Sequence, residues 1–147
     1  MSALAFAGEW QLSDSENFGS FLEQLGVDAT TRQLAESTSG CLIVYIEDDT
    51  WTVYTEGAYC IHKVQFRLGE EKEERTVDRR KVLAKRVLEG ERLVFYERNL
   101  RTNVEMRAQM EIDGKQLIQD LYCKGVTARR VYTRTPVCTL RRLTAAF

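Results

Sequence analysis

The chain has 147 residues, of which 44% are hydrophobic, so it is long enough for one domain with its own core. Its 21 basic and 22 acidic residues nearly cancel, which argues against a nucleic-acid-binding surface. No apolar run is long enough to cross a bilayer, and residues 3–7 lack the basic lead-in of a secretory signal. We therefore expect a monomeric cytoplasmic protein.

The four cysteines, Cys41, Cys60, Cys123 and Cys138, are widely spaced and form no CxxC pair. Only His62 could serve as a nitrogen co-ligand, so the spacing does not predict a zinc site. We expect no metal, no cofactor and reduced, structural cysteines.

Residues 5–12 read as a first strand, after which the hydrophobic period changes. Ser13 and Glu16 have the spacing of a capping box, and Gly26 is placed to end the helix that follows. Asp28 can cap a second short helix that runs to about residue 37. The apolar residues of the first helix recur at helical spacing: Phe18, Phe21, Leu22 and Leu25.

From residue 39 onward the sequence consists of short β-rich runs separated by turn residues, many of them glycines. With the first strand these make ten, and such a series predicts an up-and-down antiparallel β-barrel with the helix pair inserted after the first strand. The nine runs are 41–46, 50–55, 59–68, 73–77, 82–88, 92–97, 103–112, 116–123 and 126–134.

The last strand, 126–134, carries three arginines and a tyrosine. If its even positions face inward, Arg130 and Tyr132 point together into the interior, where they could hold a carboxylate. The alternative is that Arg130 pairs with a structural acid and that Tyr132 belongs to an ordinary core. Polar residues on both faces of many strands favour a barrel that encloses a ligand or water.

Nine short motifs in order resemble the intracellular lipid-binding proteins, the family of cytosolic fatty-acid-binding and retinoid-binding proteins. The resemblance covers about residues 5–134 and implies a ten-stranded, partly flattened barrel, which we assign to residues 1–134. Residues 135–147 extend beyond it, and we expect them to form a flexible C-terminal tail. The motifs are GEW (8–10) with SENF (15–18), LGV (25–27), TRQLA (31–35), WTV (51–53), FRLGEE (66–71), TVD (76–78), RKV (80–82), KGV (124–126) and RVY (130–132).

The resemblance implies a non-enzymatic carrier that binds one long-chain fatty acid, with Arg130 and Tyr132 holding its carboxylate. It also places four residues along the cavity or at its portal: Phe18, Phe21, Tyr59 and Asp78. It further suggests that Asp78 orients Arg80.

The eighth strand departs from the family pattern, because many fatty-acid binders have a second arginine where this chain has Gln109 or Met110. Alternation favours Met110 on the inner face, since the opposite register would turn two acids and an arginine inward. An inward Gln109 would instead resemble the retinol binders. A carrier of a retinoid or another neutral lipid therefore stays open.

Residues 14–36 contain five acids and only Arg32 as a base. Anionic membranes should repel this net charge of -4, which predicts transfer of ligand through water and only transient membrane contact.

No catalytic constellation is evident, and we expect His62 to be an exposed strand residue and 70–75 to be a solvated turn and edge strand. A second alternative is a lipid-gated protein-interaction module that docks through residues 135–147.

Overall fold

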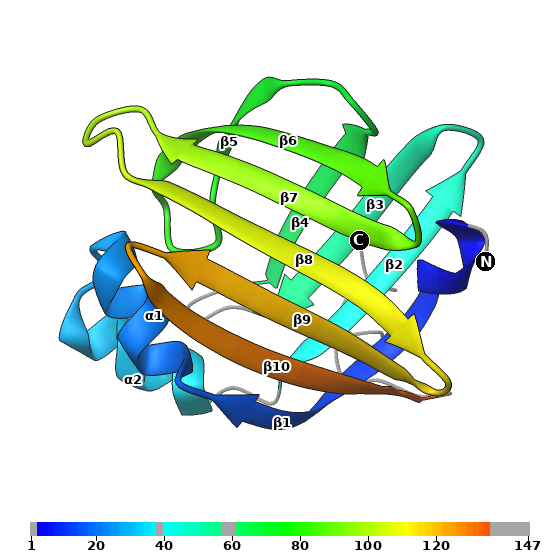
Figure 1. Ribbon diagram of the computed structural model, residues 1–147, viewed down its shortest axis with the longest axis horizontal. Helices are drawn as coiled ribbons and strands as arrows, with labels where there is room; N and C mark the ends of the chain where they lie inside the picture. The colour runs from blue at the N-terminus through cyan, green and yellow to red at the C-terminus, as the bar shows by residue number, and fades with distance from the viewer. Residues whose placement is uncertain (1–2, 38–39, 57–60, 136–147) are drawn as a thin grey trace.

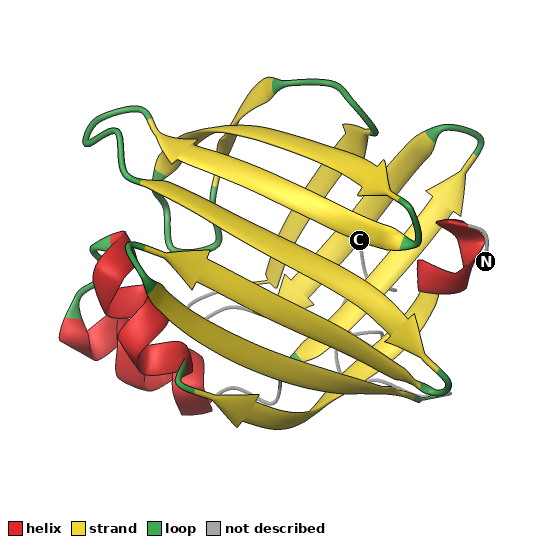
Figure 2. Cartoon of the chain, in the orientation of Figure 1, coloured by secondary structure: helices red, strands yellow, loops and turns green. Residues whose placement is uncertain are grey.

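The computed structural model describes residues 3–37, 40–56 and 61–135. Ten antiparallel strands form one sheet that curls around an interior (Figure 1), and the two α-helices lie together at one end (Figure 2). After a 3-10 helix, Ala3–Phe6, the elements are β1 Gly8–Glu16, α1 Phe18–Leu25, α2 Ala29–Ser37, β2 Cys41–Glu47, β3 Thr50–Glu56, β4 Ile61–Arg67, β5 Lys72–Arg75, β6 Lys81–Glu89, β7 Arg92–Asn99, β8 Glu105–Asp113, β9 Gln116–Cys123 and β10 Val126–Arg134.

The strand order is β4-β3-β2-β1-β10-β9-β8-β7-β6-β5, so chain neighbours are also sheet neighbours and β1 pairs with β10. This topology confirms the predicted up-and-down barrel with a helix pair after the first strand. The hydrogen-bonded ladder does not close, however, because β4 and β5 are the two ends of the sheet.

The predicted capping box was wrong. Ser13 and Glu16 belong to β1, where Ser15 and Glu16 lie opposite Arg130 and Arg129 of β10. Pairing with β10 satisfies the backbone of this segment and extends the strand past the predicted helix start. A bulge between Leu12 and Asp14 shifts the register on the way.

Asn17 lies between β1 and α1, at the N-cap position of the helix. Its backbone is left-handed, with φ 61°, and its side-chain nitrogen donates a 2.7 Å hydrogen bond to the Thr127 carbonyl of β10. Asparagine tolerates this conformation better than most residues. The start of the helix is thereby fixed to the last strand of the barrel.

The other two predicted helix signals are confirmed. Gly26 follows α1 with φ 91°, and its N–H bonds back to the Glu23 carbonyl. Asp28 accepts hydrogen bonds from the backbone N–H and the hydroxyl of Thr31, at 2.9 and 2.8 Å. We call α1, α2 and their connection, residues 18–37, the helical hairpin.

Strand alternation divides the side chains between the interior and the outer surface. On β10, Ala128, Arg130 and Tyr132 are buried, whereas Arg129 and Thr133 are exposed. The predicted inward direction of the even positions is therefore correct. Apolar side chains from the 3-10 helix, β1–β4, β7, β9 and β10 make the main core, and α1 packs on a second cluster formed with β8, β9 and β10.

The cysteine prediction was wrong at one position. Cys41 is disulfide-bonded, whereas Cys123 is free and buried. Tyr59 and residues 136–147 lie outside the described residues, so the tail stays a prediction. In the described part of the chain, no helix is long and apolar enough to cross a bilayer.

Candidate functional site

The inner faces of the strands and the helical hairpin enclose a cavity of about 290 Å³. Its wall is mostly apolar, with phenylalanine, leucine, valine and methionine side chains from both sides of the barrel. Phe18 and Phe21 of α1 close it at the helical end, where their rings stack with centroids 6.2 Å apart. A mainly apolar cavity with a few polar groups is the usual form of a small-molecule site.

Arg130 and Tyr132 lie side by side in this wall on β10. They are 8% and 5% exposed, and the Arg130 guanidinium lies 4.0 Å from the centroid of the Phe18 ring and 5.9 Å from that of Tyr132. Burial raises the pKa of the Tyr132 phenol, and the charge of Arg130 partly opposes this. At neutral pH the Tyr132 phenol therefore keeps its proton and can donate a hydrogen bond.

The Arg130 guanidinium has no acid beside it among the described residues. Its buried Nε lacks any hydrogen-bond partner, and its close contacts are the two aromatic rings. A buried charge without a counter-ion is costly, and its N–H groups suit a carboxylate. The arrangement can bind an anionic head group inside the barrel.

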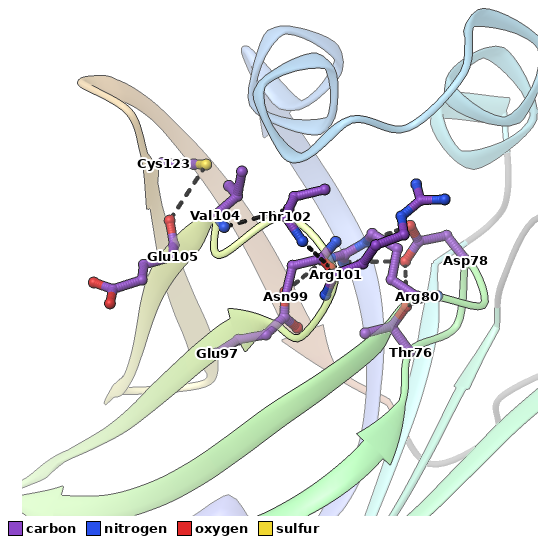
Figure 3. A network of polar contacts seen from close by, with 10 residues as sticks. All are labelled: Thr76, Asp78, Arg80, Glu97, Asn99, Arg101, Thr102, Val104, Glu105 and Cys123. Carbon is purple, nitrogen blue, oxygen red and sulfur yellow. Dashed lines mark hydrogen bonds and ion pairs between the residues drawn. The ribbon is translucent and has the colours of Figure 1, made fainter.

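A second arginine, Arg80, also lines the cavity but is neutralised within the protein (Figure 3). Its Nε and Nη2 donate to both oxygens of Asp78, at 2.6 and 3.1 Å, and its Nη1 donates to Glu97 at 2.7 Å. The Thr76 hydroxyl donates to Asp78 and accepts the Arg80 backbone N–H. Asp78 does orient Arg80, as the resemblance implied.

The two acids around Arg80 respond differently to their surroundings. Burial alone would raise the pKa of Asp78, but the hydrogen bonds and charge of Arg80 hold it below its ordinary value. Burial raises the pKa of Glu97, which Arg80 only partly opposes and Asp78 reinforces. The network therefore holds one firmly ionised acid and one that retains its proton to higher pH.

The third arginine of the cavity, Arg86 on β6, forms a two-pronged ion pair with Glu74 on β5. The two hydrogen bonds measure 2.5 and 2.9 Å, and both side chains are about nine-tenths buried. The guanidinium lies 4.3 and 4.4 Å from the ring centroids of Phe66 and Phe95. The prediction of a fully solvated 70–75 segment was wrong for Glu74, because β5 turns this acid toward the cavity.

His62 on β4 also lines the cavity and is not an exposed strand residue as predicted. Burial lowers its pKa, with Glu74 partly opposing, so the imidazole is neutral at neutral pH. The alternation of β4 could have predicted that His62 faces the cavity, because Val64 and Phe66 of the same strand also face it.

The predicted site residues can now be placed. Arg130, Tyr132 and Asp78 line the cavity together with Phe18, Phe21 and Met110. Gln109 does not; it pairs with Val94 and Asp120 in the ladder, on the strand face opposite to Met110. Sequence reasoning missed His62, Glu74, Arg86 and Glu97. Within the described ranges, no group of three or more His, Cys, Asp or Glu residues could hold a metal ion.

Comparison with known proteins gives no match to a family model. A fatty acid-binding protein of Tyrophagus putrescentiae, however, is 34% identical over 128 residues, which is 86% of this chain and 95% of that protein. The chain belongs to the fatty-acid-binding protein family. Human fatty acid-binding protein 9 is 28% identical over 88% of this chain and 96% of its own length.

A solved structure agrees with this membership. The Schistosoma mansoni fatty acid binding protein in complex with arachidonic acid superposes with a TM-score of 0.86, at 28% identity, over 92% of this chain and 99% of that one. On its last strand the chain carries Arg130 and Tyr132, and on β8 the cavity is lined by Met110 and by no arginine of the described residues.

Proposed function

We propose that this chain is a non-enzymatic carrier that binds a long-chain fatty acid in its cavity and moves it through the cytosol. Arg130 and Tyr132 hold the carboxylate, and the apolar wall surrounds the acyl chain. Burial of that chain supplies the driving force, at about 0.8 kcal/mol per methylene.

The observation that carries the proposal is the contrast among the three cavity arginines. Arg80 and Arg86 each have acids within hydrogen-bond distance, whereas the described surroundings of Arg130 offer only aromatic rings. A carboxylate bound there would neutralise the Arg130 guanidinium and accept its hydrogen bonds, as acids of the protein do for Arg80 and Arg86. The arachidonic acid in the Schistosoma relative supports this ligand class.

A retinoid carrier is less well supported. The retinol-like reading depended on an inward Gln109, and the ladder turns Met110 inward instead. Methionine offers only a weak acceptor to an alcohol, whereas Arg130 offers a charge to a carboxylate.

The test is displacement of a fluorescent fatty-acid analogue from the delipidated protein by oleate and by retinol. Arg130→Gln should weaken oleate binding about tenfold to a hundredfold, since a charge-assisted hydrogen bond contributes about 1.5–3 kcal/mol. Arg129→Gln is the matched control, because Arg129 is the exposed neighbour that pairs with Asp120 on the outer surface. Retinol displacing the probe better than oleate, with no effect of Arg130→Gln, would refute the proposal.

A further inference from the structure

The cavity contains a second group of polar side chains away from Arg130. Arg86 lies on β6 and Arg130 on β10, four places apart in the strand order. At about 4.8 Å per strand, the path along the curved wall is about 19 Å. A ligand whose carboxylate binds Arg130 can reach this group only with its hydrocarbon chain.

The group consists of the Glu74–Arg86 ion pair and His62. Arg86 is held between the rings of Phe66 and Phe95, so the pair is fixed in position. Arg86 contacts Phe66 of β4, and His62 lies on the same strand and lines the same cavity. All three contribute to the wall of the cavity.

His62 has unused hydrogen-bonding capacity toward the cavity. A neutral imidazole has one donor and one acceptor. The His62 backbone lies opposite Thr55 in the ladder, but its imidazole makes no hydrogen bond to another described residue. A plain acyl chain lying here would exclude water from the imidazole and from the ion pair without replacing its hydrogen bonds. A group that both donates and accepts would replace them.

We propose that His62, Glu74 and Arg86 form a second polar subsite, which takes a hydroxyl group on the hydrocarbon chain of a bound fatty acid. The inference rests on the proposed carrier function. A hydroxyl can donate to Glu74 or the imidazole and accept from the imidazole or the guanidinium. A second carboxylate suits the subsite poorly, because Glu74 already neutralises Arg86 and would repel another anion.

The experiment measures the affinity of the delipidated protein for octadecanoate and for octadecanoates that carry one hydroxyl at different carbons. The readout is the ratio of the two affinities at each hydroxyl position. We expect a maximum of about tenfold in favour of the hydroxy acid at one position, equivalent to about 1.4 kcal/mol. In Glu74→Leu/Arg86→Leu the ratio should fall to about one, and in His62→Phe it should fall part of the way.

The double variant removes both charges, because removing one would leave the other buried and unpaired. The matched control is Asp120→Leu/Arg129→Leu, which removes a two-pronged ion pair from the outer surface and should keep the preference. A ratio near one at every position, or a preference that survives in both cavity variants, would overturn the subsite. So would tighter binding of an octadecanedioate. If the wild-type protein bound octadecanoate and none of the hydroxy acids better, only the subsite would fail; binding of no acid would overturn the carrier proposal as well.

Discussion

Trp10→Phe tests how the N-terminal segment is attached to the barrel. Trp10 is fully buried on β1, and its indole N–H donates a 3.0 Å hydrogen bond to the buried carbonyl of Phe6. The Arg134 guanidinium lies 4.2 Å from the centroid of the indole and donates to the carbonyls of Ala5 and Ala7. The Trp10 side chain on β1 therefore contacts both the 3-10 helix, through Phe6, and the end of β10, through Arg134.

The expected loss of stability can be estimated from these contacts. Phenylalanine keeps most of the apolar contact but leaves the Phe6 carbonyl without its donor, which costs about 1–3 kcal/mol. A weaker cation–π contact with Arg134 adds about 0.5–1 kcal/mol. We expect the free energy of unfolding to fall by about 1.5–4 kcal/mol, or the Tm by roughly 3–16 °C.

The assay is urea denaturation followed by circular dichroism, with Trp51→Phe as the matched control. Trp51 is also buried and lies between Phe6 and Phe66, but its indole makes no hydrogen bond to the rest of the described chain. Trp10→Phe should therefore cost at least about 1 kcal/mol more than Trp51→Phe. Equal losses in the two variants would refute the reasoning.

Three other predictions concern the acid network, the helix start and ligand transfer. Because the pKa of Glu97 is raised in the folded protein, protonated Glu97 adds stability at low pH, and this contribution is lost as pH rises through the folded pKa. Urea denaturation from about pH 4 to pH 8 should therefore show the free energy of unfolding of Glu97→Gln rising relative to that of the wild type. The opposite trend would contradict this. Asn17→Ala should cost about 1 kcal/mol more than Asn17→Gly in the same assay, since both lose the bond to Thr127 but only glycine accepts φ 61° without strain. The helical hairpin has more acids, Glu23, Asp28 and Glu36, than bases, Arg32, so anionic vesicles should repel it. The rate of transfer of a fluorescent fatty acid to acceptor vesicles should therefore not increase with their content of anionic lipid. A rate that rises with anionic lipid would show membrane contact.

Much of the fold could be predicted because its signals are local. Turn glycines and period-two alternation located the strands, and the bounds of β9 and β10 agree with the predicted 116–123 and 126–134. Gly26 and Asp28 marked helix boundaries through contacts within a few residues. The Ser13 and Glu16 signal failed because a distant strand, β10, supplied better partners for the same backbone.

The site could be predicted only where one strand carries the information. Arg130 and Tyr132 occur two residues apart on β10, so alternation alone brings them to the same face. The Glu74–Arg86 pair joins residues twelve apart on different strands, and Glu74 lies in a charged run that looks solvated. Its burial depends on how the edge strand β5 sits against β6, which the sequence pattern does not reveal.

The open ladder between β4 and β5 exposes the protein to a hazard that a closed barrel avoids. Each terminal strand of a sheet has unpaired backbone groups that can add a strand from another molecule. Here β5 is only four residues long, Lys72–Arg75, and all four are charged; β4 exposes Lys63 and Arg67. Short length and charge are the features that discourage such strand addition. The strand that supplies Glu74 to the cavity, β5, therefore has a length and a composition that also protect the protein from edge-to-edge aggregation.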